Sequence, residues 1–504
     1  MKLNIKNVGA CLLLGGTLLT VTSCNDLLDL DPVSQITPDS FYKTADQLGA
    51  YMINYYGELQ NPFSGAMFHG GGYDDGIARS DGNTDIQVVG GGNTQLFVPD
   101  KWEVSGGKQL QGWYGTVRAF NYFLKTAEAR NEAGEIEGDD KLILNYIGEG
   151  YFFRALTYYR MLALYGDLPI VTEVLEDNNE VIVENSKRAP RNEVVRFILS
   201  DLDKAIERLY DRDHFKGQRV NKQTAALLKS RVALFEATWE KYHAGTALVP
   251  NGTGWPGAGK DYNAGYQFPS GSIEKEIEFF LTEAMSAASQ VADAVQLTEN
   301  NQIIRDQASK GKNPYYDMFA SHDPSGYSEV IMYRGYDLSL NNSHHFNHYL
   351  YSGGNTGYTH QFEQVFLMEN GLPVYAAGSG YAGDDYITDT KIDRDWRWRL
   401  FMKAPKEAKA VDNIATVEYF PEAPRLYVSD AKNATSTGYI QGKGYSLDYN
   451  DQLLGKDQTA FVVYRASEAY LNSIASSHLT NRNTDPTADK YWKALRARPG
   501  VDTD

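Results

Sequence analysis

The stretch Gly148–Ile170, GEGYFFRALTYYRMLALYGDLPI, decides the fold predicted for this chain. Apolar and aromatic residues recur there every three or four positions, which places them on one side of an α-helix. Other apolar residues extend the stripe nearly around the helix, so it needs neighbours on several sides. Gly166 permits a left-handed cap and Pro169 prevents continuation, so we expect the helix to end between them. The stripe consists of Ile147, Tyr151, Ala155, Tyr158, Leu162 and Tyr165.

Two charged residues interrupt this apolar surface, Glu149 and Arg154. We interpret them as solvated or paired side chains on the polar side of a core helix, because the surrounding pattern is not typical of an active site.

The composition excludes several classes of function. The chain has 504 residues, 42% of them hydrophobic, and a formal net charge of -17. This balance disfavours nucleic acids and anionic lipid surfaces, because both are bound by Lys and Arg. Aromatic residues make up 12% of the chain and include 35 Tyr. Tyrosine combines an apolar face with a hydroxyl group, which suits contacts with neutral polar ligands such as sugars.

The N-terminus is typical of a secreted lipoprotein. Lys2 and Lys6 precede an apolar stretch that is too short for a stable membrane span, as in a secretory signal. Val-Thr-Ser-Cys at 21–24 resembles a lipobox, in which the cysteine becomes the lipidated first residue. We therefore expect a signal peptide over 1–23 and lipidation of Cys24. The alternative is an ordinary signal peptide with a chance cysteine. Cys11 is the only other cysteine, so the mature chain has no cysteine metal site or disulfide.

Further helices and long glycine-rich loops alternate along the chain. We expect helices beginning at Thr37 and Trp113, and further helices at about 194–209, 221–234, 277–295, 463–476 and 491–498, with Asn221 capping one of them. The segments 60–112, 244–272 and 313–460 lack helical periodicity and contain many Gly, Tyr, Asn and Asp residues. Loops of such length are typically functional.

Several of these motifs together resemble the SusD/RagB family. The order Gly-Glu-x-Tyr-Phe-Phe-Arg-Ala at 148–155 and Tyr-Gly-Asp-Leu-Pro at 165–169 is similar to the most recognisable helix of the family. The Asp-Leu-x-x-Ala-Ile pattern at 201–206, the helix after Asn221 and the C-terminal segments at 464–472 and 491–501 are similar as well.

The resemblance implies a mainly α fold with a tetratricopeptide-like scaffold of helical pairs and a large loop-rich region carrying a few short strands. One domain would span 24–504, with the scaffold at about 37–300 and 461–501 and the loop-rich region at about 313–460. Family members usually continue beyond the helix that ends near Val501, so the sequence is expected to be a fragment or a natural truncation.

The resemblance also implies a function. Members are surface lipoproteins of the outer membrane that bind glycans or other nutrients beside a SusC-like TonB-dependent transporter, and they are not enzymes. Two alternatives stay open. One is a helical glycoside hydrolase with two catalytic carboxylic acids, and the other is a structural lid of the transporter that binds a non-carbohydrate nutrient.

A glycan site needs aromatic faces flanked by groups that bond hydroxyls. We select Trp102 and Tyr351 for stacking, with four polar partners: Asp81, Asn83, Asn355 and Arg397. Trp102 could also be a core residue, and Arg397 could merely pair with Asp393 or Asp395.

Two patterns were weighed as cofactor sites. His344, His345 and His348 are interpreted as solvated loop histidines rather than metal ligands. Gly254–Asp261 narrowly misses a P-loop, because Asp261 replaces the hydroxyl that would hold magnesium. No cofactor is therefore predicted, and structural calcium is left open.

Overall fold

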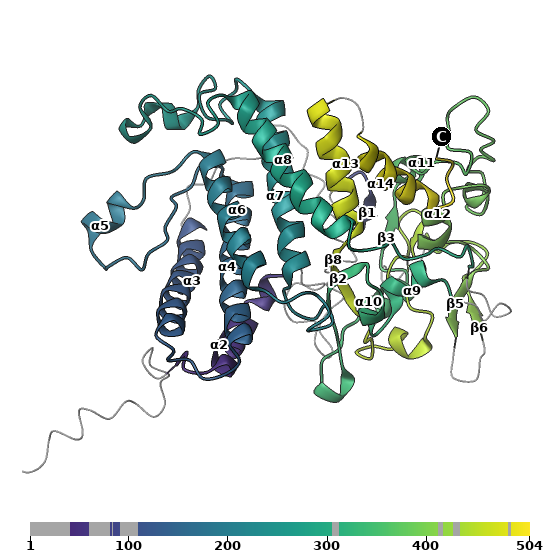
Figure 1. Cartoon of the computed structure of the whole chain (residues 1–504). Helices are drawn as coiled ribbons and strands as arrows, with labels where there is room; N and C mark the ends of the chain where they lie inside the picture. The colour runs from purple at the N-terminus through teal and green to yellow at the C-terminus, as the bar shows by residue number, and fades with distance from the viewer. Residues whose placement is uncertain are drawn as a thin grey trace, which may run out of the picture.

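Long helices make one side of the molecule, and loops with short strands make the other (Figure 1). The computed structural model describes residues 41–59, 81–82, 84–90, 109–304, 312–411, 417–426, 434–481 and 485–503. Trp102, Asn83, Cys24 and the predicted signal peptide therefore lie outside the described residues.

The helices pack side by side in a series of neighbours: α3 on α4, α4 on α6, α6 on α7, α7 on α8, α8 on α13 and α13 on α14. Residues 133–139 join α3 to α4, and longer segments at 166–190, 209–221 and 244–272 join α4 to α6, α6 to α7 and α7 to α8. This is the mainly α, helical-pair scaffold predicted from the sequence. Its members are α2 (Ala45–Ile53), α3 (Gln109–Glu132), α4 (Asp140–Tyr165), α5 (Asn179–Glu184), α6 (Arg191–Arg208), α7 (Lys222–His243), α8 (Ile273–Ala292), α13 (Ser467–Asn481) and α14 (Pro486–Ala497).

Helix α4 lies at the centre of the scaffold and contains the signature stretch. It ends at Tyr165 with Gly166 at φ 71°, as the sequence predicts. Its glycines allow close packing. A Cβ on Gly150 would lie 2.7 Å from the Phe123 ring of α3, and one on Gly148 would lie 3.0 Å from Cβ of Arg208 on α6. Small residues are therefore required where α3 and α6 approach the helix.

The two charged residues of the signature fasten α4 to its neighbours. Arg154 donates two hydrogen bonds to Asp201 of α6, at 2.7 and 2.8 Å, and both side chains are buried. Glu149 accepts bonds of 2.9 and 2.7 Å from Arg219. Both residues are paired, as predicted, but they lie in the core rather than on a solvated side. Buried charges need such partners, since an unpaired one is strongly destabilising.

Three local predictions need correction. Among the described residues the predicted first helix spans Ala45–Ile53 and does not include 41–44, because Thr44 caps it by accepting from the Gln47 amide and Tyr42 has a φ of 64°, while Thr37 lies outside the described residues. Residues 461–465 form a strand, β8, before α13 begins at Ser467. The loop histidines His344 and His345 are buried rather than solvated. His344 lies 3.1 Å from the Asp457 carboxylate.

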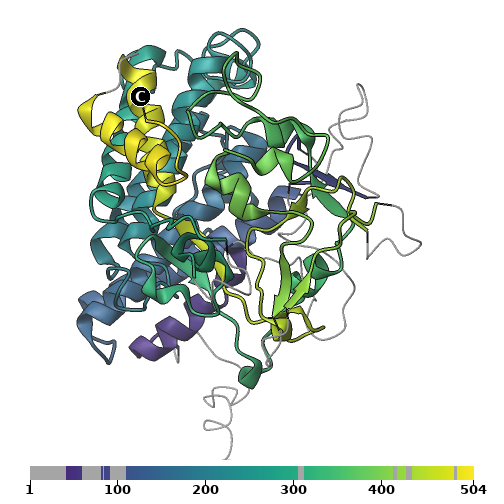
Figure 2. The same cartoon turned by 90° about the vertical axis from the view of Figure 1, so that its right-hand side faces the viewer.

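The loop-rich region folds back on the scaffold through four two-stranded antiparallel sheets. Figure 2 shows it covering the face beside the yellow C-terminal helices. The pair β2–β8 fastens both ends of the region, because β2 precedes most of it and β8 follows it. The strands are β1 (Gln87–Val89), β2 (Val330–Arg334), β3 (Thr356–Tyr358), β4 (Met402–Lys403), β5 (Ala408–Val411), β6 (Val417–Tyr419), β7 (Ile440–Gln441) and β8 (Phe461–Arg465). The short helices are α9 (Pro314–Ala320), α10 (Phe346–Tyr351), α11 (His360–Gln364) and α12 (Trp396–Phe401).

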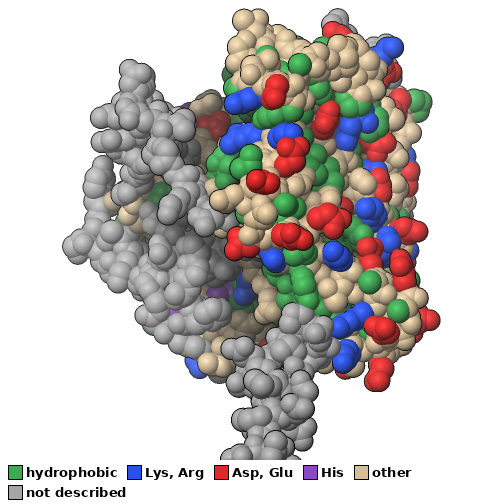
Figure 3. All heavy atoms as spheres, turned by 90° about the vertical axis from the view of Figure 1, so that its left-hand side faces the viewer, with side chains coloured by type: hydrophobic (Ala, Val, Ile, Leu, Met, Phe, Trp, Pro, Cys, Tyr) green, Lys and Arg blue, Asp and Glu red, His purple; other side chains and the backbone are tan. Residues whose placement is uncertain are grey.

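The outer side of the scaffold carries charges of both signs. Figure 3 shows Lys and Arg side chains mixed with Asp and Glu over the helical surface, without either sign gathering in one place. None of the helices among the described residues has the length and apolar character needed to cross a membrane.

Candidate functional site

A cleft lies where the loop-rich region meets β8, α13 and α14, and we call it the α13 cleft. It has two lobes with volumes of about 520 and 350 Å³. The lobes share six wall residues and are therefore adjacent parts of one hollow: Tyr358, Phe362, Lys443, Arg465, Ser467 and Leu471. Each lobe falls within the volume range of small-molecule binding sites.

Aromatic rings line one wall of the α13 cleft. The Tyr358 and Phe362 rings lie 5.2 Å apart, and Phe362 and Phe366 lie 5.0 Å apart. All three side chains are half-buried, so part of each ring is accessible from the cleft. On α14, Trp492 is 42% exposed at the edge of the smaller lobe. The cleft thus combines several apolar ring faces with open volume.

Charged groups lie between these rings. Lys443 is exposed to both lobes, and Asp81 lines the larger one. Arg397 lines the smaller lobe, where its guanidinium donates to the buried Asp395 carboxylate, with 3.0 Å between Nε and Oδ1. Asp395 also caps α12. Pairing with Asp395 is the alternative weighed from the sequence, yet the Arg397 side chain stays 46% exposed, so it can still meet a ligand.

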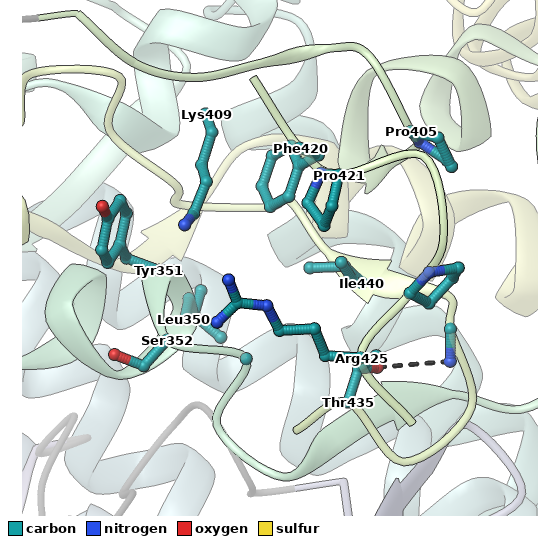
Figure 4. Close-up of a pocket in the computed structure, with 13 residues that line it drawn as sticks. Leu350, Tyr351, Ser352, Pro405, Lys409, Phe420, Pro421, Arg425, Thr435 and Ile440 are labelled. Atoms are coloured by element: carbon teal, nitrogen blue, oxygen red, sulfur yellow. Dashed lines mark hydrogen bonds between the residues drawn. The ribbon is translucent and has the colours of Figure 1, made fainter. Parts of the chain in front are cut away.

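Tyr351 lies outside the α13 cleft, beside a cavity of about 40 Å³ (Figure 4). Its hydroxyl donates to Glu418 at 2.5 Å, and Lys409 Nζ lies 3.7 Å from the ring centroid. Desolvation and the bond to Glu418 raise the pKa of Tyr351 above its ordinary value. In Figure 4 the side chains of Lys409 and Arg425 point into the space beside the ring. A cavity of this size holds water but not a sugar ring.

Asn355 supports the backbone rather than lining an open space. Its carbonyl accepts a hydrogen bond of 2.8 Å from the Gly90 amide, and its own amide donates to Ala434 at 2.8 Å. Its φ of 50° is in the left-handed region, which asparagine tolerates. Asn355 thus connects the end of β1 to the loop before β3.

Two of the six predicted residues, Asp81 and Arg397, therefore line the same cleft, while Tyr351 and Asn355 do not. Lys443 and the aromatic wall were not predicted from the sequence. One signal was present for the wall, because aromatic residues at 358, 362 and 366 recur every four positions. Lys443 has no local pattern that marks it.

Another cavity is larger, at about 610 Å³, and lies between α2 and β2. It suits a ring-binding ligand less well than the α13 cleft. Of the three tyrosines that line it, Tyr333 and Tyr336 are only 2% and 9% exposed, and only Tyr56 is half-buried, so the cavity presents fewer accessible ring faces than the aromatic wall.

Comparisons with known proteins agree with this architecture. A family model described as "Starch-binding associating with outer membrane", SusD-like, matches residues 81–234. SusD-like protein P2 of Formosa agariphila is 28% identical over 232 residues, which cover 44% of this chain and 42% of that protein. The chain is thus similar to SusD-like proteins. SusD-like protein P25 of the same organism is 25% identical over 237 residues, covering 43% of this chain and 41% of that protein. The matches span about two fifths of the length of these curated relatives.

The fold extends over nearly all of this SusD-like chain. A SusD-like protein from Bacteroides fragilis superposes with a TM-score of 0.59 at 18% identity, covering 94% of this chain and 82% of that chain. A SusD-like carbohydrate binding protein from the same species gives a TM-score of 0.60 at 14% identity, covering 92% and 80%. At such identities the likeness shows the fold alone. The signature residues of α4 belong to this shared scaffold, whereas the α13 cleft is formed jointly by the loop-rich region and by β8, α13 and α14.

Proposed function

We propose that this SusD-like chain binds oligosaccharides in the α13 cleft at the bacterial cell surface and passes them to a SusC-like TonB-dependent transporter. The observation that carries the proposal is the wall of accessible aromatic faces beside charged groups, in a chain whose family model describes starch binding at the outer membrane. Sugar rings pack their apolar C–H faces on aromatic rings and bond their hydroxyls to charged side chains.

Binding without hydrolysis fits the carboxylates of the cleft. Among the described residues that line the two lobes, the acids are Asp81 and Glu468. Both oxygens of Glu468 accept hydrogen bonds from Arg231, at 2.6 and 2.7 Å. A glycoside hydrolase needs one carboxylic acid that gives a proton and a second carboxylate placed across the bond. Glu468 is already paired with Arg231. Among the described residues that line the lobes, Asp81 therefore has no second, unpaired carboxylate to act with.

The anchor and the partner belong to the same proposal. Lipidation at Cys24 would hold the chain on the membrane without a spanning helix, because acyl chains supply the attachment. Labelling cells with a clickable fatty acid tests it: wild-type chain should carry the label and Cys24→Ala should not. Labelling of that variant would refute the anchor. Co-purification of a TonB-dependent transporter with the tagged chain from its own cells would support the partnership.

Ligand binding can be tested with purified protein and a panel of polysaccharides. Affinity electrophoresis detects binding, and an assay of new reducing ends in the same mixtures detects hydrolysis. The informative variant is Trp492→Ala, and the matched control is Tyr375→Ala, an aromatic residue that is 84% exposed and absent from the walls of the cleft. Loss of a stacking ring should weaken binding about 5- to 10-fold.

Retarded migration without new reducing ends, weakened by Trp492→Ala but not by Tyr375→Ala, would support the proposal. New reducing ends would favour the hydrolase alternative. An absence of both effects with every glycan would favour a lid or a non-carbohydrate nutrient. If Trp492→Ala and Tyr375→Ala weakened glycan binding equally, the ligand would bind outside the α13 cleft.

A further inference from the structure

Two arginines at the wall of the α13 cleft share one carboxylate. Arg465 at the end of β8 and Arg498 after α14 both donate to Glu329, with 2.7 and 2.8 Å between their NH1 atoms and Oε1. Glu329 is buried, which alone would raise its pKa, but the two arginines hold the pKa below its ordinary value. The carboxylate is therefore ionised and cancels only one of the two positive charges.

Lys443 adds a further positive charge, which Asp81 on the wall of the larger lobe offsets in part. Among the described residues no carboxylate forms an ion pair with it. Its ammonium lies 4.7 Å from the centroid of the Phe319 ring, and the Arg465 guanidinium lies 5.2 Å from the same centroid. Desolvation and repulsion by Arg465 and Arg498 lower the pKa of Lys443 to about 8, while attraction by Asp81 and Glu329 opposes this shift. At pH 7 the amine still carries its charge, in a region where the potential is positive.

Arg498 also has an unused donor. Its side chain is 7% exposed, and its Nε atom is buried without a hydrogen-bond partner among the described residues. A buried donor without a partner costs free energy that an acceptor could recover. This arrangement is not a general property of the molecule, because the net charge is -17 and the scaffold surface mixes both signs (Figure 3).

We infer that the α13 cleft binds an acidic sugar, one that carries a uronate carboxylate or a sulfate ester, at a subsite formed by Lys443, Arg465 and Arg498. This inference rests on the proposed glycan-binding function and names its substrate class. An oxyanion placed there neutralises the remaining positive charge and gains charge-assisted hydrogen bonds. The aromatic wall holds the ring of the same sugar or of its neighbours.

Matched pairs of glycans test the substrate class. Calorimetry with purified protein would compare oligogalacturonate with the same oligomers after carboxyl reduction, and sulfated with desulfated chondroitin oligosaccharides, beside a panel of neutral glycans. The first pair isolates the carboxylate and the second isolates the sulfate. We expect the member of at least one pair that carries the tested group to bind at least 10-fold more tightly than the member that lacks it, and this preference to shrink in high salt.

Variants locate the subsite. Lys443→Gln should abolish most of the preference for the acidic member and leave neutral glycans within about 2-fold, whereas Lys443→Arg should keep it. The matched control is Lys406→Gln, which removes the same charge from a lysine 72% exposed outside the cleft. Because Lys443 is exposed and forms no ion pair among the described residues, Lys443→Gln should fold normally, and circular dichroism would check this.

The outcomes separate the two levels of the proposal. Binding of neutral glycans without preference for any acidic member would overturn the acidic subsite and leave glycan capture intact. If Lys443→Gln kept the preference for acidic glycans, the inference that Lys443 forms part of the acidic subsite would be overturned. Failure of every glycan, neutral or acidic, would overturn glycan capture and the acidic subsite together.

Discussion

Replacing Glu240 by glutamine should make the free energy of unfolding depend less on pH between pH 4.5 and about 9. Glu240 lies on α7, its side chain is fully buried, and neither carboxylate oxygen has a hydrogen-bond partner among the described residues. Burial, followed by repulsion from Glu236 and Glu276, raises its pKa to about 9, although Arg191 and Arg196 oppose this. Those arginines already bond the other two glutamates, which leaves Glu240 as the third acid beside two cations.

The sign of the pH effect follows from proton binding. Glu240 has an ordinary pKa of 4.5 when the chain is unfolded, so between pH 4.5 and about 9 the folded protein holds a proton that the unfolded chain releases. The free energy of unfolding therefore falls as pH rises through this window. Each pH unit changes it by about 1.4 kcal/mol, so raising the pH from 4.5 to 7 costs about 3 kcal/mol. Glutamine resembles the protonated acid in shape but does not titrate. The substitution therefore removes the contribution of Glu240 to the pH dependence of the free energy of unfolding.

Thermal unfolding measured from pH 4.5 to 8 gives the test. With an unfolding entropy of about 2 cal/mol/K per residue, 1 kcal/mol corresponds to about 1 °C in a protein of this length. The Tm of the wild type should therefore fall by about 3 °C more than the Tm of Glu240→Gln between pH 4.5 and 7. The control is Glu207→Gln, which makes the same chemical change at a side chain that is 78% exposed. Parallel Tm curves for wild type and Glu240→Gln would show that Glu240 titrates normally and would refute the reasoning.

Three further predictions concern the scaffold and the cleft. Asp201→Asn should lower the free energy of unfolding in urea by about 3–5 kcal/mol, because it leaves the Arg154 charge buried without its partner; a loss below about 1 kcal/mol would show that the pair is solvated. Gly150→Ala should cost about 1–3 kcal/mol, because its Cβ would meet the Phe123 ring at 2.7 Å, and an unchanged Tm would contradict the close packing. Binding of an acidic glycan should weaken as pH rises from 7 to 9, because Lys443, with a pKa of about 8, loses its charge there. Calorimetry with Lys443→Arg should show a flatter profile, and equal profiles would argue against Lys443 as the titrating group.

The scaffold was predictable because its signals are local. The apolar stripe of α4 and its glycine stop lie within one stretch, and Asn221 and Ser272 cap α7 and α8 through amides three residues on. The start of the first helix was misplaced because a good cap, Thr44, lies some residues after Pro38, the first plausible helical start. Local patterns thus predict which helices form more reliably than where they begin.

The loop-rich region was not predictable in the same way, because its contacts join distant residues. His344 is buried because its two ring nitrogens contact the Asp457 carboxylate and the Thr459 carbonyl, more than 110 residues later in the chain. Nothing near His344 in the sequence indicates that partner. The α13 cleft is an extreme case, since its walls draw on positions from Asp81 to Val501. Candidate residues could therefore be proposed by type, but their grouping required the structure.

The charges of the cleft divide into those that hold the fold and one that is free to select a ligand. Glu329 fastens β8 and the end of α14 through Arg465 and Arg498, so its loss would leave two arginines unpaired at large cost in stability. Lys443 lies beside them but forms no ion pair among the described residues, and an exposed substitution there costs at most about 0.5 kcal/mol. A change at Lys443 can therefore alter which glycan is preferred without loosening the scaffold.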